Sequence, residues 1–205
     1  MSIVIPESVK SYCASHGVRT AINTLTEHGP SYLPDNLEWD ELPSYYQSVL
    51  AAATVKTDFA LLFINIWDAV WKPALEACGV TEPWTIDDLQ QQEEYPPSLD
   101  TLWDFGFYRT HYHPNDQEAR IDTNVEIGIV QNQLLIYISL ATWDAEGNPQ
   151  ELVLSAEWEQ SASDDGWYNT VKDAFPAIDP KTSTEIDSTP MRKAAEEALR
   201  RMMSV

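Results

Sequence analysis

The chain has 205 residues, 43% of them hydrophobic and 11% aromatic, so it is long and apolar enough to bury a substantial core. Its 33 acidic and 12 basic residues give a formal charge of -21 and a pI near 4.2. This charge argues against direct binding to nucleic acid or to an anionic membrane, because both need clustered Lys and Arg, and it predicts that any charged partner is basic.

Two short helices are expected at the start of the chain. Pro6 suits the entry of the first, and Gly17 lies where that helix would end; residues 18–28 repeat the pattern, with His28 followed by Gly29. A His in the last turn favours the negative end of the helix dipole, and Gly takes the left-handed cap. We therefore expect His16 and His28 to be structural rather than ligands or bases.

The amino-terminal stretch MSIVIPESVK has neither a basic segment nor a long apolar run, so no signal peptide is expected. Cys13 and Cys78 lie in separate segments, which is typical of a reducing compartment where thiols serve as small buried side chains. These features predict a cytoplasmic protein, and nothing in the sequence indicates a cofactor.

Residues 29–43 are predicted to form a loop, because Pro30, Pro34 and Pro43 interrupt regular structure. Acidic residues cluster in this loop around Trp39, namely Asp35, Glu38, Asp40 and Glu41. An exposed Trp among acids would be a contact surface, whereas a Trp folded back on the core would be structural. Both interpretations are open, and the second is the commoner arrangement.

A helix at 44–55, with Ser44 as its cap, is expected to lead into a buried helix at 57–72, with a slight interruption at Lys56 and Thr57. In TDFALLFINIWDAVWK, at about 100° per residue, the polar residues Asp58, Asn65, Asp68 and Lys72 fall in an arc of about 80°. The stretch is shorter than the roughly 20 apolar residues that span a bilayer. It therefore predicts the core helix of a soluble protein, ended or kinked by Pro73.

A short helix is expected at 82–92, started by Thr85, with Asp87 and Asp88 in the first turn, where acids are favoured. Tyr95-Pro96-Pro97 then breaks regular structure, and the pattern changes from helical to extended. The expected organisation is a helical region at 1–95, a sheet region with a linker at 96–188 and a C-terminal helix at 189–205. These parts are expected to form one compact unit.

From Leu102 onward the hydrophobic pattern has a period of two, which predicts an antiparallel meander of three or four strands. The expected strands are WDFGFYRTHYH, NVEIGIV, LLIYISLATW and ELVLSAEWE, separated by turns at 114–116, 131–133 and 144–149. LLIYISLATW is apolar on both faces, as a central strand should be. Residues 167–175 predict one or two helical turns, and 176–188 a linker rich in Pro, Thr and Ser.

The last helix is signalled by Thr189 as cap and Pro190 at the first helical position. Its apolar stripe is Met191, Ala195, Ala198 and Met202, and Glu196 with Arg200 and Glu197 with Arg201 form i,i+4 pairs in the favourable order. The helix is net basic while the rest of the chain is strongly acidic. We therefore expect it to dock on the acidic body.

No fingerprint for nucleotide binding, serine hydrolysis or zinc binding appears in the chain. The one constellation that suggests a metal is His111 and His113, whose spacing puts both rings on one strand face, with Asp116, Glu118 and Asp122 nearby. They are weak candidates for zinc or iron, and an exposed strand end is the alternative. Asp122 and Glu126 suggest a nuclease carboxylate pair, but the Lys usual two positions later is Gly128.

Two long segments contain neither Lys nor Arg: eight acids lie between Lys72 and Arg109, and nine between Ile121 and Val171. Such a distribution costs stability through self-repulsion, and three explanations are open. The first is that the protein neutralises a basic partner, since it has the charge profile of immunity proteins, anti-defence inhibitors and DNA mimics. The second is that it is adapted to high salt, and the third is that it is an enzyme whose acidity is incidental.

We expect an α+β protein with a helical N-terminal half, an antiparallel β-meander in the second half and a closing C-terminal helix. The favoured function is that of an acidic, non-catalytic binding protein that inhibits a basic or nucleic-acid-handling protein. An enzyme with a metal site at His111 and His113, and a protein from a high-salt organism, are the alternatives. The expected partner-binding residues are the acids of the base-free segments, Asp87, Asp88, Glu93, Glu94, Glu157, Glu159, Asp164 and Asp165.

Overall fold

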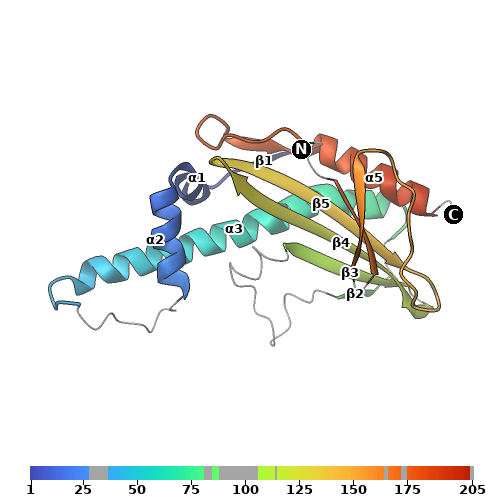
Figure 1. Cartoon of the computed structure of the whole chain (residues 1–205), viewed down its shortest axis with the longest axis horizontal. Coiled ribbons are helices and arrows are strands. Elements are labelled where there is room, and N and C mark those ends of the chain that lie inside the picture. Colours follow the sequence, from blue (N-terminus) through green and yellow to red (C-terminus); the bar gives the residue numbers. More distant parts are fainter. Residues whose placement is uncertain are drawn as a thin grey trace.

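The structure, a computed structural model, describes residues 1–27, 37–80, 85–87, 106–113, 115–163, 166–171 and 175–203. In chain order the elements are β1 (Ser2–Val4), α1 (Glu7–Ala14), α2 (His16–Glu27), α3 (Leu42–Ala77), β2 (Thr85–Asp87), β3 (Phe107–His113), β4 (Asp116–Val130), β5 (Gln133–Trp143), β6 (Trp158–Ser163), β7 (Gly166–Val171), β8 (Glu185–Asp187) and α5 (Thr189–Met203). The expected α+β class is confirmed, with helices in the first half, an antiparallel sheet in the second and a helix at the end (Figure 1).

The main sheet is antiparallel and has the strand order β2-β3-β4-β5-β7-β6, so its six strands exceed the three or four expected. Its centre is a long hairpin of β4 and β5, paired from Arg120 opposite Trp143 to Val130 opposite Gln133. The turn between them has left-handed φ angles of 51° and 65° at Gln131 and Asn132, which match the twist of a tight hairpin. The predictions of this turn and of a central strand over 134–143 are confirmed.

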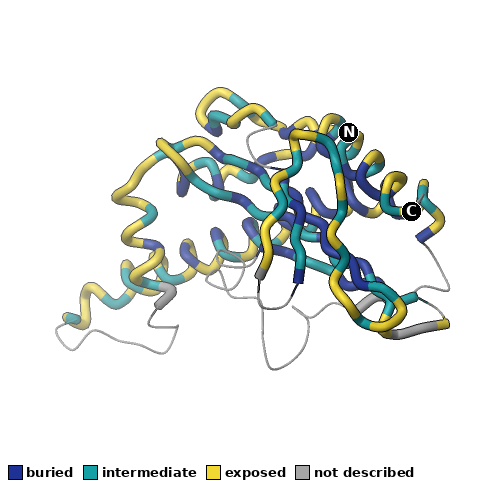
Figure 2. Tube along the Cα trace, turned by 45° about the vertical axis from the view of Figure 1, so that its right-hand side comes forward, coloured by how far each residue is buried: buried dark blue, intermediate teal, exposed yellow. Residues whose placement is uncertain are grey.

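One face of this sheet is covered by α3. Side chains that alternate along β4 and β5 lie buried on that face: Ile121, Thr123, Val125, Ile127, Leu134, Ile136, Ile138 and Leu140. From α3 the large side chains Phe59, Leu62, Phe63, Ile66, Trp67 and Trp71 are buried against them. The buried residues thus gather between the helices and the sheet (Figure 2), as expected for a core built around 57–72.

The two ends of the chain meet beside this core. Strand β1 pairs with β8, with Ile3 opposite Ile186, and α5 packs on α3 through the buried Met191, Ala195, Ala198 and Leu199. The docking of the last helix is therefore achieved by its apolar stripe. Its ion pairs lie within the helix, as predicted, with Arg200 and Arg201 placed 3.6 Å and 2.9 Å from Glu196 and Glu197.

The long helix differs from its expected form. α3 runs without a break through Lys56 and Thr57, because Lys favours a helix and the Thr57 hydroxyl donates a hydrogen bond to the Ala53 carbonyl at 3.0 Å. It starts at Leu42, before the expected cap Ser44, with Pro43 in its first turn. Pro73 lies inside the helix, which continues to Ala77 and is followed by Gly79 with a positive φ of 79°.

At the amino end, Gly17 does not stop a helix. Ser15 separates α1 from α2 with extended backbone angles, and His16 and Gly17 open α2, so the expected His-Gly cap is wrong at this position. The second pair, His28 and Gly29, lies outside the described residues.

Several short strands replace expected helices or linkers. Within the predicted helix at 82–92, residues 85–87 form the edge strand β2, with Ile86 opposite His111. Within the predicted helical turns at 167–175, residues up to Val171 form β7, since Trp, Tyr, Thr and Val favour strands. The expected linker contains β8, and Ile178 exchanges two backbone hydrogen bonds with Leu134, of 2.8 Å and 2.9 Å.

The expected strand at 151–159 starts only at Trp158. Residues 151–155 have no strand partner, although Leu152 and Leu154 pack against the core. The alternation that suggested a strand therefore reflects a segment without regular structure, in which Leu152 and Leu154 face the core and Val153 faces solvent.

Candidate functional site

The imidazole of His111 is part of the core. Only 2% of the residue is exposed, and its ring is stacked on the indole of Trp67, with centroids 5.9 Å apart and planes 7° apart. The guanidinium of Arg109 lies 4.5 Å from the Trp67 ring centre, and Phe107 meets that indole edge-on. Phe107, Arg109 and His111 thus lie on one strand face, as the period of two requires, but the interpretation of His111 as an exposed strand end is wrong.

Burial lowers the pKa of His111 to about 4, with a hydrogen bond to the Ile121 backbone opposing the shift and the charge of Arg109 adding to it. The ring is therefore neutral at physiological pH. His113 lies beyond an irregularity in the pairing of β3 and β4, and its Nδ1 accepts a hydrogen bond from the Asn115 N–H at 3.3 Å. Among the described residues, no three or more His, Cys, Asp and Glu side chains lie close enough together to hold a metal ion.

The opposite face of β4 carries the other candidate pair. Asp122, Asn124 and Glu126 alternate with the buried residues, and the Asn124 side-chain N–H donates to Glu126 Oε1 at 3.2 Å. Burial raises the pKa of Asp122, opposed by a hydrogen bond from Thr110 and by the charge of Arg120, and its Oδ1 has no hydrogen-bond partner. Burial therefore favours the protonated form of this carboxyl, but the described residues place no group of three or more His, Cys, Asp and Glu side chains around it that could hold a metal ion.

The thiols show no sign of reactivity. Cys13 is fully buried on α1, and burial raises its pKa to about 12 although the charge of Arg19 opposes this. Cys78 is half-buried, and its pKa is also raised, mainly by burial. Because the thiolate is the nucleophile, neither group is prepared for covalent catalysis.

The predicted partner-binding acids are divided between two edges of the sheet. Asp87 lies on edge strand β2, opposite Thr110, whereas Glu159 lies on β6 at the other edge, with Glu157 in the turn before it. Five strand spacings separate these edges, about 24 Å along the sheet. Glu157 and Glu159 are exposed; Asp88, Glu93, Glu94, Asp164 and Asp165 lie outside the described residues.

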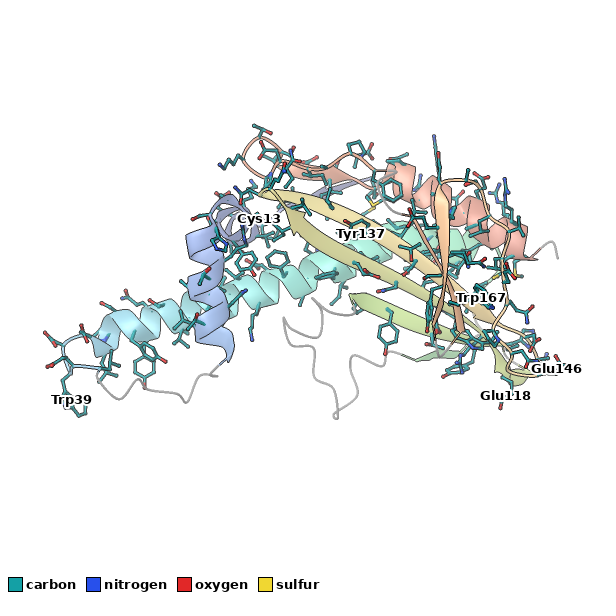
Figure 3. The ribbon with its side chains drawn as sticks, viewed as in Figure 1. Cys13, Trp39, Glu118, Tyr137, Glu146 and Trp167 are labelled. Atoms are coloured by element: carbon teal, nitrogen blue, oxygen red, sulfur yellow. The ribbon has the colours of Figure 1, made fainter. Side chains whose placement is uncertain are left out.

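A further group of acids lies where β4 begins and β5 ends. Figure 3 shows Glu118 and Glu146 at this end of the sheet, and the Glu118 carboxylate lies beside Gly147, the residue after Glu146. Asp144 is structural, because its carboxylate accepts hydrogen bonds from the backbone N–H groups of Glu146 and Asn148 and from Gln150. The bond from the Asn148 backbone is the main reason that the pKa of Asp144 is lowered.

The sequence left open whether Trp39 is exposed or packed on the core. It lies in the turn before α3, is 89% exposed, and stands at the end of that helix away from the sheet (Figure 3). The interpretation of a Trp folded back on the core is therefore wrong. Glu38, Asp40 and Glu41 beside it are exposed, and Glu41 Oε2 accepts a hydrogen bond from the Glu38 N–H at 3.1 Å.

A scan against protein-family models, a search of curated proteins and a search of solved structures each found no match to this chain. Among the described residues, one helix, α3, is long and apolar enough to cross a membrane by length and composition. The core helix of a soluble protein passes the same test, and the buried side chains of α3 between Phe59 and Leu75 belong to the core that the helix forms with the sheet and α5. Leu61, Asn65, Asp68 and Lys72 in this range are exposed.

Proposed function

We propose that the protein is an acidic, non-catalytic binding protein that captures and inhibits a basic protein, as an immunity protein, an anti-defence inhibitor or a DNA mimic does. The observation that carries this proposal is the base-free segment from Ile121 to Val171, which contains nine acids and forms most of β4 and all of β5, β6 and β7. Four of its acids are exposed: Glu146 in the loop after β5, Glu151 further along the chain, and Glu157 and Glu159 at the start of β6.

The ion pairs seen within the helices do not neutralise the negative charge of the sheet. Lys10 pairs with Glu7 on α1, and Arg192 and Arg200 pair with Glu196 on α5, each with a neighbour on the same helix. The bases of α5 are thus partly occupied by its own acids rather than by those of the sheet. A partner rich in Lys and Arg would relieve the self-repulsion of the sheet and associate rapidly with it.

An enzyme is the weaker candidate on the described residues. His111 is neutral and buried, both thiols have raised pKa values, and Asp122 alone has a carboxyl with a raised pKa. Adaptation to high salt would account for the acidic surface and the scarcity of Lys. It is distinguished from binding by the stability of the fold at low salt, which is addressed in the Discussion.

Capture from a lysate of the source organism tests the proposal. Wild-type protein should retain a basic protein at low salt and release it progressively toward about 0.5 M salt. The double reversal Glu157→Lys with Glu159→Lys should abolish capture, whereas the matched reversal Glu76→Lys with Glu185→Lys, at exposed sites on α3 and β8, should not. Both variants change the net charge equally, so equal effects, or no capture by the wild type, would contradict the proposal.

A further inference from the structure

The first part of α3 projects from the body. None of the residues from Leu42 to Ala51 is buried, and burial along the helix begins at Ala52. With 36 residues, α3 is about 54 Å long. Figure 1 shows its N-terminal part extending past α2, which crosses it, to an end that none of the described strands reaches. We call the exposed side of the segment from Glu38 to Leu61 the α3 arm.

Large apolar side chains form an exposed stripe along the arm. Trp39 at its end is 89% exposed, and Tyr46, Leu50 and Leu61 are 48%, 67% and 49% exposed. Tyr46 and Leu50 are i,i+4 neighbours, and Leu50 and Leu61 are about 20° apart around the helix, three turns along it. Large apolar side chains that line one side of an exposed helix in this way are a candidate interaction surface.

Two threonines between Leu50 and Leu61 extend the stripe. The hydroxyls of Thr54 and Thr57 donate to the carbonyls of Leu50 and Ala53, at 2.9 Å and 3.0 Å. Because each hydroxyl is turned back to its own helix, the exposed part of each side chain is mostly its methyl group. The stripe therefore offers a partner apolar contact with little polar surface to desolvate.

The charge around the stripe selects the partner. Glu38, Asp40 and Glu41 are exposed beside Trp39, and the chain has no Lys or Arg between Arg19 and Lys56. Arg19 is held elsewhere, by the Cys13 carbonyl at 2.6 Å and Asn132 at 3.0 Å. A second copy of this chain would bring like charges together, and an anionic membrane would repel the same acids.

We propose that Trp39, Tyr46, Leu50 and Leu61 form the docking face for an amphipathic helix of a protein partner, whose apolar side is bordered by Lys and Arg. Trp39 is the aromatic anchor, and the acids beside it meet the basic border. This inference rests on the proposed function and deepens it. The acidic sheet accelerates encounter, and the apolar arm supplies the contact that slows dissociation.

The test uses the full-length protein and a fluorescein-labelled synthetic peptide of Leu and Lys, patterned as an amphipathic helix and followed by fluorescence anisotropy. Trp39→Ser with Leu50→Ser should weaken peptide binding at least tenfold, whereas Val153→Ser, at a site that is 88% exposed, should leave it unchanged. All of these side chains are largely exposed, so the variants should fold, which circular dichroism checks.

Each other outcome overturns the docking inference. If only Glu157→Lys with Glu159→Lys weakens the peptide, the arm is not the docking face and the proposed function stands. If wild-type protein does not bind the peptide, or binds neutral phosphatidylcholine vesicles or itself through Trp39, the arm serves another occupant. The lysate capture described above then decides the proposed function separately.

Discussion

The indole N–H of Trp67 donates a hydrogen bond to the Thr123 hydroxyl at 3.0 Å, between two side chains that are almost completely buried. The same indole carries the stacked ring of His111 on β3. One side chain of α3 therefore fixes the helix to two neighbouring strands, through a polar contact to β4 and a ring contact to β3. Together with the hydrogen bond from the Trp71 indole N–H to the Asn124 carbonyl at 2.9 Å, this junction holds the sheet on α3.

Thr123→Val should lower the free energy of unfolding by about 1–3 kcal/mol, because it leaves the buried Trp67 N–H without an acceptor. Chemical denaturation measures the change, and a double-mutant cycle with Trp67→Phe isolates the pair. In the Trp67→Phe background the same substitution should cost much less. An equal cost in both backgrounds would mean that the hydrogen bond does not contribute.

His111 should make stability depend on pH. Its pKa of about 4 in the folded state lies below the ordinary value of 6.5, so the unfolded chain binds more protons between these values. Stability should therefore fall as the pH falls from about 6.5 to about 4, by roughly 3 kcal/mol at about 1.4 kcal/mol per pKa unit. Denaturation of His111→Phe over this range should show a flatter profile than wild type; an unchanged profile would contradict the assignment.

Gly106 should tolerate substitution far less than Gly79. Both have positive φ, of 70° and 79°, but a Cβ on Gly106 would lie 2.2 Å from the Val125 carbonyl oxygen, whereas on Gly79 it would meet nothing within 4 Å. Gly79→Ala should cost only about 1 kcal/mol of unfolding free energy, for the left-handed conformation. Gly106→Ala should cost several-fold more, or prevent folding. Similar losses in the two variants would show that the steric contact is relieved.

The response to salt separates binding from adaptation to high salt. Screening shortens the Debye length from about 10 Å at 0.1 M to about 3 Å at 1 M, so some stabilisation by salt is expected for any chain of charge -21. We expect the protein to be folded at low salt, with a modest rise in melting temperature as KCl is added. A chain that folds only in molar KCl would be a salt-adapted protein, and its charge would no longer indicate a partner.

Secondary structure was predicted most accurately from the sequence where a hydrophobic pattern extends over many residues. The apolar run within α3, the two-sided apolar strand β5 and the stripe of α5 each hold enough residues to determine their own structure. Strands β1, β2 and β8 have three residues each and exist through pairing with distant segments, which local patterns do not encode.

In the candidate sites, too, the sequence predicts local arrangement but not the contacts between distant elements. The shared strand face of Phe107, Arg109 and His111 follows from a period of two, but burial of His111 depends on Trp67, a residue on another element. Likewise, the acids around Trp39 are visible in the sequence, while its exposure depends on how far α3 extends beyond α2.

The most direct test of the central claim is an inhibition titration with the basic protein obtained by capture. At low salt, adding the acidic protein to its captured basic partner should abolish the partner's activity at a ratio near one to one. The activity should return toward 0.5 M salt, and Glu157→Lys with Glu159→Lys should fail to inhibit. A partner whose activity is unchanged by excess protein, or a small molecule turned over with no partner present, would contradict the claim.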